Sequence, residues 1–314
     1  MAPRPIIIDC DPGQDDAVAL FLAMASPDEL EILGITTVAG NVPLALTERN
    51  TRMMCDIANS QAPVFAGCRK PMIRDAISAE YIHGETGING IDAFEPKTRL
   101  QDKHAVDFII DTLLAKDTVP VTLIPTGPLT NVATAIERNP DILPHIEEIV
   151  IMGGAMREGG NRTPSAEFNI LVDPHAADIV LNCGRPITLM GLDITHKVLS
   201  TEERVARIGE LKNAVADATV GMLSFFHRYD TEKYSSQGTP LHDPCTVAWL
   251  LKPELFKTRH CNVSVETESE LTMGHTAVDF WHVTDRPKNV SWAFDIDADG
   301  FYDLLTERLS RFPL

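Results

Sequence analysis

The chain has 314 residues, of which 44% are hydrophobic and 23% charged, as expected for a globular enzyme of one large domain or two ordinary ones. Its 45 acidic and 27 basic side chains give a formal net charge of −18, which argues against nucleic acid or an anionic membrane as a partner. No apolar run approaches the ~20 residues of a membrane-spanning helix, and we expect no signal peptide. The six cysteines are scattered without C-x-x-C spacing, so we expect reduced thiols and a cytoplasmic location.

Strand and helix patterns alternate along the chain and predict one α/β domain over residues 1–314, with a mostly parallel, Rossmann-like core sheet flanked by helices. Residues 67–101 show neither pattern and are expected to form a loop, and the chain is more helical after about residue 200. The predicted strands cover residues 6–8, 30–38, 63–66, 119–124, 148–152, 186–190, 261–266 and 290–294. The predicted helices cover residues 17–25, 43–58, 102–115, 129–138, 173–182, 201–209, 213–234 and 300–309.

An acidic segment joins the first predicted strand to the first predicted helix. It holds four carboxylates within eight residues, Asp9, Asp11, Asp15 and Asp16. A Pro-Gly turn places them at the carboxyl end of a strand and in the first turn of a helix, where open α/β sheets bind ligands. The side-chain period of two along a strand aligns Asp9 with Asp11. Because crowded carboxylates need a cation or shared protons, and no Cys/His ligand spacing lies nearby, the segment predicts a calcium or magnesium site.

Helix capping is the simpler explanation for an acidic residue at the start of a helix. One cap needs a single carboxylate, however, and this segment has four around its turn. A metal site therefore explains the segment better than capping does.

Polar residues also follow later predicted strands, at the edge of the sheet where a ligand would bind. Asn41 follows strand 30–38, and Thr126 follows strand 119–124 in a turn that could direct its backbone carbonyl toward a cation. The loop after strand 148–152 begins with a Gly-Gly pair, which alone is weak evidence for a site, and continues with Asn161, Glu167 and Asn169.

A His-Asp-Pro sequence precedes the apolar stretch 245–251. Taken alone, it is better explained by Asp243 capping a helix that starts with proline, with His242 on the surface. A histidine beside an aspartate could instead pair a proton donor with a metal ligand. Tyr229 and Tyr234 lie just before this segment, and although aromatic residues at helical spacing more often pack in the core, both are candidates for stacking on a flat ligand.

The sequence resembles a known enzyme family in several places. Residues 9–19 resemble the N-terminal signature of the nucleoside hydrolases, the inosine–uridine-preferring N-ribohydrolase family. Six more segments resemble family segments in family order and extend the likeness over nearly the whole chain: residues 39–41, 83–87, 126–131, 152–155, 166–169 and 242–244.

The resemblance implies calcium-dependent hydrolysis of the N-glycosidic bond of ribonucleosides to free base and ribose, with one calcium ion per subunit. By matching position, the implied calcium ligands are Asp11, Asp16, the Thr126 backbone carbonyl and Asp243, whereas Asp9 is not usually counted as a ligand. The family commonly forms homodimers or homotetramers and serves nucleoside salvage, so the implied partners are a small nucleoside and further copies of the chain.

The same resemblance implies two catalytic residues, Asp15 as the general base for the attacking water and His242 as the acid that protonates the departing base. Breaking an N-glycosidic bond develops oxocarbenium character on the ribose and negative charge on the base, which suits such a pair. The implied ribose contacts are Asp15, Asn41, the Met152 backbone, Asn161, Glu167 and Asn169. The candidate contacts to the rest of the substrate are His83 and the two stacking candidates, Tyr229 and Tyr234.

Substrate choice rests on a few positions. His83 and the region of Lys233 and Tyr234 resemble the bacterial pyrimidine-preferring branch, so uridine and cytidine are the expected substrates. Phe226 and Asp230 stand where some of those members carry amide or hydroxyl residues, which leaves a purine-preferring, inosine-preferring or broad-specificity hydrolase as the alternative.

Two other classes of protein fit the sequence less well than a nucleoside hydrolase does. Dehalogenase-type phosphatases also open with a strand and an Asp-x-Asp pair, but they carry Thr or Val where this chain has Pro12-Gly13, and basic residues are scarce here for binding phosphate. A nucleoside-binding protein without turnover would have no need of both Asp15 and His242.

Overall fold

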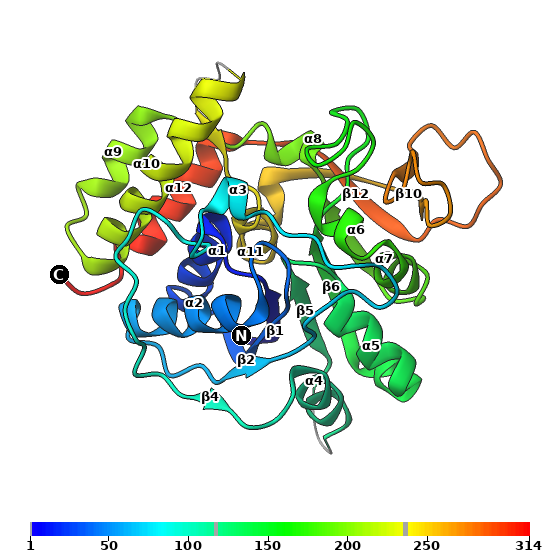
Figure 1. Ribbon diagram of the computed structural model, residues 1–314, viewed down its shortest axis with the longest axis horizontal. Helices are drawn as coiled ribbons and strands as arrows, with labels where there is room; N and C mark the ends of the chain where they lie inside the picture. Colours follow the sequence, from blue (N-terminus) through cyan, green and yellow to red (C-terminus); the bar gives the residue numbers. More distant parts are fainter. Residues whose placement is uncertain (1, 116–118, 235–237) are drawn as a thin grey trace.

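The computed structural model describes residues 2–115, 119–234 and 238–314, apart from the side chains of Tyr81 and of residues 227–234. Within these residues a ten-stranded sheet forms the centre of the molecule (Figure 1), in the order β11-β10-β12-β7-β6-β5-β1-β2-β3-β4. Its strands are β1 (Arg4–Cys10), β2 (Leu30–Thr37), β3 (Val64–Ala66), β4 (Leu100–Gln101), β5 (Val121–Pro125), β6 (Ile146–Met152), β7 (Ile187–Met190), β10 (Phe256–Val265), β11 (Thr276–Asp279) and β12 (Val290–Ile296). A separate pair joins β8 (Leu199–Ser200) to β9 (Thr239–Pro240).

The sheet is mostly parallel, which confirms the predicted fold class. Strands β4, β3, β2, β1, β5, β6, β7 and β12 pair in parallel, and only β10 pairs antiparallel with both of its neighbours. Helices cover both faces, so successive residues of a central strand are all buried. In β1, Ile6 and Ile8 pack into the core on one face and Ile7 into the core on the other.

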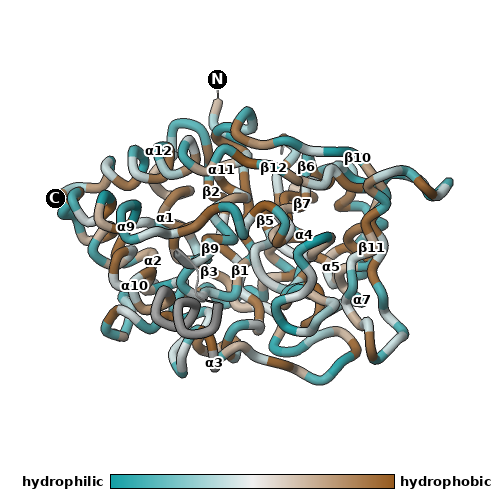
Figure 2. Tube along the Cα trace, turned by 90° about the horizontal axis from the view of Figure 1, so that it is seen from above, coloured by the Kyte–Doolittle hydropathy of each residue, from teal (hydrophilic) through white to brown (hydrophobic). Residues whose placement is uncertain are grey.

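The helices divide between these two cores. Helices α1, α2, α10, α11 and α12 supply residues to the first core, and α4, α5 and α7 supply the second. Figure 1 shows α9, α10 and α12 together near the C-terminus, and in Figure 2 the hydrophobic segments concentrate in the central strands. The α-helices are α1 (Gln14–Met24), α2 (Leu44–Ile57), α3 (Glu80–His83), α4 (Ala105–Leu114), α5 (Thr130–Arg138), α6 (Phe168–Val172), α7 (Pro174–Leu181), α8 (Leu192–Thr195), α9 (Glu202–Gly209), α10 (Ala214–Tyr234), α11 (Pro244–Leu251) and α12 (Ala298–Leu309).

The order of the strands reverses at β1. The chain proceeds from β1 outward through β2, β3 and β4, and β5 then returns to pair with the other side of β1. Such a reversal opens a crevice beyond the carboxyl ends of the two strands. The segments that follow β1 and β5 therefore meet at the place where this fold class binds ligands.

Several local predictions need correction. The supposed loop 67–101 contains the short elements α3 and β4. The prediction that α2 begins at Pro43 is wrong by one residue, because Pro43 is the N-cap and Leu44 the first helical residue. Helices α6 and α8 and strands β8, β9 and β11 were not predicted, because elements this short give too few residues for a periodicity to emerge.

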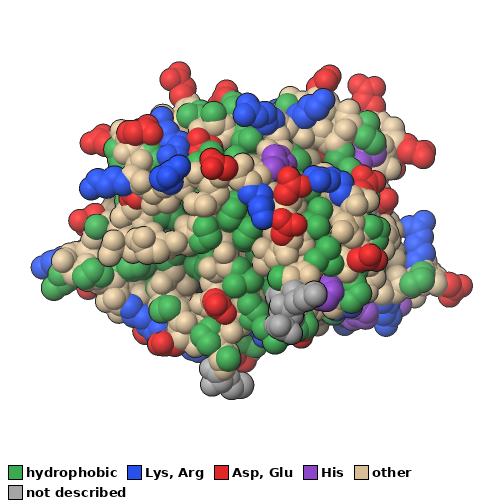
Figure 3. Space-filling view, turned by 90° about the horizontal axis from the view of Figure 1, so that it is seen from below, with side chains coloured by type: hydrophobic (Ala, Val, Ile, Leu, Met, Phe, Trp, Pro, Cys, Tyr) green, Lys and Arg blue, Asp and Glu red, His purple; other side chains and the backbone are tan. Residues whose placement is uncertain are grey.

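Two surface observations bear on the partners. No described helix is both long enough and apolar enough to cross a membrane. On the face shown in Figure 3, lysine and arginine side chains are interspersed with acidic ones and form no continuous basic patch of the kind that binds nucleic acid.

Candidate active site

The acidic segment lies at the junction between β1 and α1. The Gly13 backbone N–H, at the N-cap of α1, donates to Asp16 Oδ2 at 3.0 Å, and the Thr126 hydroxyl donates to Asp16 Oδ1 at 2.8 Å. Asp16 thus does cap the helix, which accounts for one carboxylate of the segment. It also ties the end of β5 to the start of α1 across the crevice.

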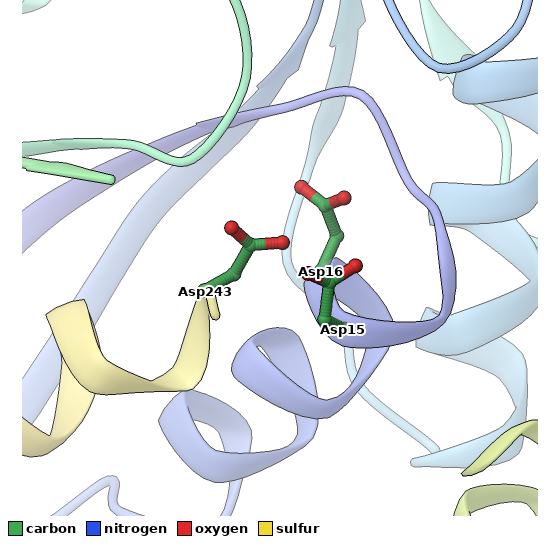
Figure 4. Close-up of side chains that lie close together, drawn as sticks. All are labelled: Asp15, Asp16 and Asp243. Carbon is green, nitrogen blue, oxygen red and sulfur yellow. The ribbon is translucent and has the colours of Figure 1, made fainter. Parts of the chain in front are cut away.

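Three carboxylates converge at this place. Figure 4 shows Asp15 and Asp16 on the first turn of α1 and Asp243 at the start of α11. One oxygen atom of each lies within 4.8 Å of one from each of the others. Although Asp243 occupies the N-cap position of α11, its side chain makes no capping hydrogen bond, so the capping interpretation of Asp243 is wrong. Its carboxylate faces α1 instead.

Asp11 lies beside this group and is fixed by Asn41. The Asn41 backbone N–H donates to Asp11 Oδ2 at 2.7 Å, while its side-chain Nδ2 donates to the Asp11 carbonyl at 3.1 Å and to Asp16 Oδ2 at 3.4 Å. A Cβ atom at Gly40 or Gly127 would collide with the Asp11 carboxylate, so both glycines are needed to make room for it. The other oxygen, Oδ1, is buried and has no hydrogen-bond partner among the described residues.

Asp9 points elsewhere. Its Oδ1 accepts hydrogen bonds from the Thr36 hydroxyl at 2.6 Å and from Asn131 Nδ2 at 2.7 Å, on the α5 side of the sheet. The alignment of Asp9 with Asp11 expected from strand periodicity fails because β1 ends at Cys10. Asp9 therefore supports the strand ends and is not part of the convergent group.

The carboxylates of this group are buried without a counter-ion. None of the ion pairs among the described residues includes Asp11, Asp15, Asp16 or Asp243. Burial, and then the neighbouring carboxylates, raise the pKa of Asp15 to about 7 and hold those of Asp11 and Asp243 well above their usual range. A set of oxygen donors with this unmet negative charge fits a hard divalent cation.

Two of these carboxylates, Asp15 and Asp243, line a cavity of about 480 Å³, a size suited to a small molecule. Asn41, Thr126 and polar residues of the loop 153–169 also line it. The rings of His83, Phe226 and His242 complete the lining. The cavity thus combines oxygen-rich groups with flat aromatic rings.

The polar side of the cavity is held by backbone hydrogen bonds. Glu167 caps α6 and accepts from the N–H groups of Gly154 at 3.0 Å, Asn169 at 2.9 Å and Ile170 at 3.2 Å. Burial nevertheless raises the pKa of Glu167 to about 6. Asn169 Nδ2 donates to the carbonyls of Thr126 at 2.6 Å and Met152 at 3.3 Å, and Asn161 Oδ1 accepts from the Phe168 N–H at 3.0 Å.

Asp193, at the start of α8, anchors the first part of this loop. Its carboxylate accepts from the backbone N–H groups of Met156 at 2.7 Å and Arg157 at 2.8 Å, and its side chain is buried. We expect Asp193→Ala to lower the free energy of unfolding by about 1–3 kcal/mol, because two partly buried backbone N–H groups lose a charged acceptor. The loosened loop should raise KM more than it lowers kcat. Chemical denaturation and steady-state kinetics measure the two effects, and unchanged values in both would contradict the anchoring role.

Two histidines line the cavity, His83 and His242. His242 Nδ1 lies 2.7 Å from the Thr195 hydroxyl, and burial, followed by the charges of His196 and His83, lowers its pKa to about 3. His83 Nδ1 lies 2.6 Å from Gln14 Oε1, and burial lowers its pKa to about 4. Burial therefore disfavours the charged form of both rings while the cavity holds no ligand.

The structure brings most of the predicted site residues to this one cavity. The side chains of Tyr229 and Tyr234 lie outside the described residues, so their proposed stacking stays a prediction. Gln14 and Thr195, which contact His83 and His242, and Asp193, which anchors the loop 153–169, were not singled out from the sequence. Only Gln14, inside the acidic segment, had a local signal that could have drawn attention to it.

Comparisons with known proteins agree with this fold and site. The family model for the inosine-uridine preferring nucleoside hydrolases matches residues 6–303. The pyrimidine-specific ribonucleoside hydrolase RihA of Photobacterium profundum is 47% identical over 98% of this chain and 99% of its own, and an uncharacterized protein of Schizosaccharomyces pombe is 48% identical over 98% and 99%. The solved structure of a purine-preferring ribonucleoside hydrolase from Gardnerella vaginalis superimposes with a TM-score of 0.90 at 33% identity, covering 98% of both chains.

The α/β fold, the acidic cavity and these similarities define a hydrolase that acts on N-glycosyl bonds. The chain belongs to the inosine-uridine preferring nucleoside hydrolase family.

Proposed function

We propose that this protein hydrolyses ribonucleosides to free base and ribose in a calcium-dependent reaction, with a preference for the pyrimidine nucleosides uridine and cytidine. The observation that carries the proposal is the group of buried carboxylates without a counter-ion, two of which line a cavity large enough for a small molecule. Hydrolysis of an N-glycosidic bond needs groups that orient the sugar and accept a proton from the attacking water, and these carboxylates can supply both.

Calcium would be held by the carboxylates of Asp11, Asp16 and Asp243 and by the Thr126 backbone carbonyl. Asp11 Oδ1 supports this assignment, since it is buried and lacks a partner among the described residues. When bound, calcium supplies positive charge that orients the ribose hydroxyls and lowers the pKa of the attacking water. No basic side chain of the described ion pairs competes for these positions.

Asp15 is the proposed general base, because its raised pKa suits a group that accepts a proton from water near neutral pH. His242, which lines the same cavity, is the proposed acid that donates a proton to the leaving base, in its form with both ring nitrogens protonated. Asn41, the Met152 backbone, Asn161, Glu167 and Asn169 are the proposed ribose contacts, since they line the space next to the carboxylates. The base would then lie between His83 and His242, near Tyr229 and Tyr234.

The pyrimidine preference is supported by the 47% identity to proteins described as pyrimidine-specific ribonucleoside hydrolases. The alternative, a purine-preferring or broad-specificity hydrolase, is supported by the close superposition on the purine-preferring enzyme from Gardnerella vaginalis. Phe226 favours neither, because stacking on its ring suits any flat base.

A comparison of uridine, cytidine, inosine and adenosine tests both the reaction and the preference. We expect release of free base and ribose without added phosphate, with a higher kcat/KM for the two pyrimidine nucleosides. A strict requirement for phosphate would indicate a phosphorylase, binding without turnover a nucleoside-binding protein, and a higher kcat/KM for inosine the purine branch.

We further propose that the protein is cytoplasmic and works as a homodimer or homotetramer. Analytical ultracentrifugation of the purified protein tests the second part, and a monomer at micromolar concentration would contradict it.

A further inference from the structure

Gln14 lies between the acidic segment and His83, at the first position of α1, and is fully buried. Its side-chain Nε2 donates to two backbone carbonyls, those of His83 and Asn89, each at 3.2 Å. Its Oε1 lies 2.6 Å from His83 Nδ1. The amide thus spans the turn that carries His83.

These contacts fix the direction of the amide. In the opposite orientation the amide oxygen would face two carbonyl oxygens, and both donated hydrogen bonds would be lost at a buried site. The amide oxygen must therefore face His83 Nδ1. Since a carbonyl oxygen only accepts hydrogen bonds, Nδ1 must carry the proton.

The other ring nitrogen of His83 is then an acceptor. Burial lowers the pKa of His83 to about 4, so the ring carries only one proton at neutral pH. The ring stacks on Phe226, with centroids 5.5 Å apart and planes at 22°, and it lines the cavity. Its Nε2 makes no hydrogen bond to any described residue, which leaves its lone pair for a ligand.

We propose that Gln14 is a positioning residue that locks His83 in the Nδ1-protonated form, so that His83 Nε2 accepts a hydrogen bond from an N–H group of the nucleobase. This inference rests on the proposed function and assigns different roles to the two histidines. The partner of His242 is the Thr195 hydroxyl, which can accept a hydrogen bond from Nδ1 as well as donate one, so His242 can hold a proton on each nitrogen and give the Nε2 proton to the base. In His83 the Gln14 oxygen keeps the single proton on Nδ1, so Nε2 has no proton to donate to the base.

The probe for this contact is 3-methyluridine, in which a methyl group replaces the ring N–H of uridine. We expect the wild-type protein to show a kcat/KM about 10-fold lower for 3-methyluridine than for uridine, the effect of one lost hydrogen bond. In Gln14→Met, which keeps the length of the side chain but not its acceptor, we expect this discrimination to shrink toward one. The same variant should lose more activity on uridine than on p-nitrophenyl riboside, which has no base N–H.

The matched control is Gln101→Met, the same replacement at an exposed position of β4, which should keep the wild-type discrimination. Equal discrimination in wild type and Gln14→Met would overturn the inference, because a merely steric effect of the methyl group does not depend on Gln14. A wild-type protein that does not distinguish the two nucleosides would overturn it as well.

A second measurement does not need turnover or a folded variant. In the wild-type protein labelled with ¹⁵N-histidine, the shifts of the His83 ring identify which nitrogen carries the proton. We expect a protonated Nδ1 and an unprotonated Nε2, and the reverse pattern would overturn the inference. Failure of the proposed function is distinguishable, since it would appear as no hydrolysis of any nucleoside while the tautomer of His83 could still be read.

Discussion

Replacing Asp11 by Asn should abolish calcium binding and lower kcat/KM for uridine by about 10³-fold or more, since a catalytic metal contributes several kcal/mol. Asp11 has one oxygen fixed by the Asn41 N–H and the other buried without a partner among the described residues. The amide keeps the size of the side chain but removes the charge that a hard cation needs. Calorimetric titration of calcium into the metal-free variant, together with steady-state kinetics, measures both effects.

Asp9→Asn is the matched control, since it makes the same replacement two residues earlier. The Asn oxygen can still accept from Thr36 and Asn131, so we expect calcium binding close to that of the wild type. Full calcium affinity in Asp11→Asn, or the same loss in both variants, would refute the assignment of Asp11. Thermal unfolding of each variant shows whether it remains folded.

The metal assignment also has a pH signature. Without the ion, the pKa of Asp15 is raised from 3.8 to about 7, so the folded state binds more protons than the unfolded one between these values. The metal-free protein should therefore lose stability as the pH rises through this range. Calcium competes with those protons, so its stabilising effect should be larger at pH 8 than at pH 5.5, and the opposite trend would contradict the site.

Replacing His242 by Ala should lower kcat for uridine by about 10²–10⁴-fold, the usual contribution of a positioned proton donor. Uracil leaves as a poorly stabilised anion unless it receives a proton, whereas p-nitrophenolate leaves without one. The same variant should therefore lose much less activity on p-nitrophenyl riboside. Steady-state kinetics on the two substrates gives the comparison directly.

His196→Ala provides the control for this prediction. His196 lies next to His242, with ring centroids 5.9 Å apart, but its Nδ1 is paired with Glu158 at 3.0 Å near the rim of the cavity. We expect a loss below about 10-fold that is similar for both substrates. Equal losses on uridine and p-nitrophenyl riboside in His242→Ala would exclude His242 as the proton donor.

The sequence by itself determined the fold class and the place of the acidic end of the site. The periodicity of the apolar residues identifies the strands and the helices. Strands that alternate with helices predict a parallel sheet, because each helix connects two parallel strands and covers a face of the sheet. Asp11, Asp15 and Asp16 could be located because they follow a strand and a Pro-Gly turn within a few residues. Their crowding is a local property, and its electrostatic cost can be recognised without tertiary structure.

The family resemblance implied Asp243 as a ligand, but only the tertiary structure shows which carboxylates meet and which groups face the histidines. Asp243 reads as a helix cap in sequence, and only the packing of α11 against α1 turns its side chain toward Asp15 and Asp16. Asp9 reads as a partner of Asp11, yet Thr36 and Asn131, from two other elements, take up its carboxylate. Gln14 and His83 are 69 residues apart, so the hydrogen bond between them exists only after the sheet has brought α1 and α3 together.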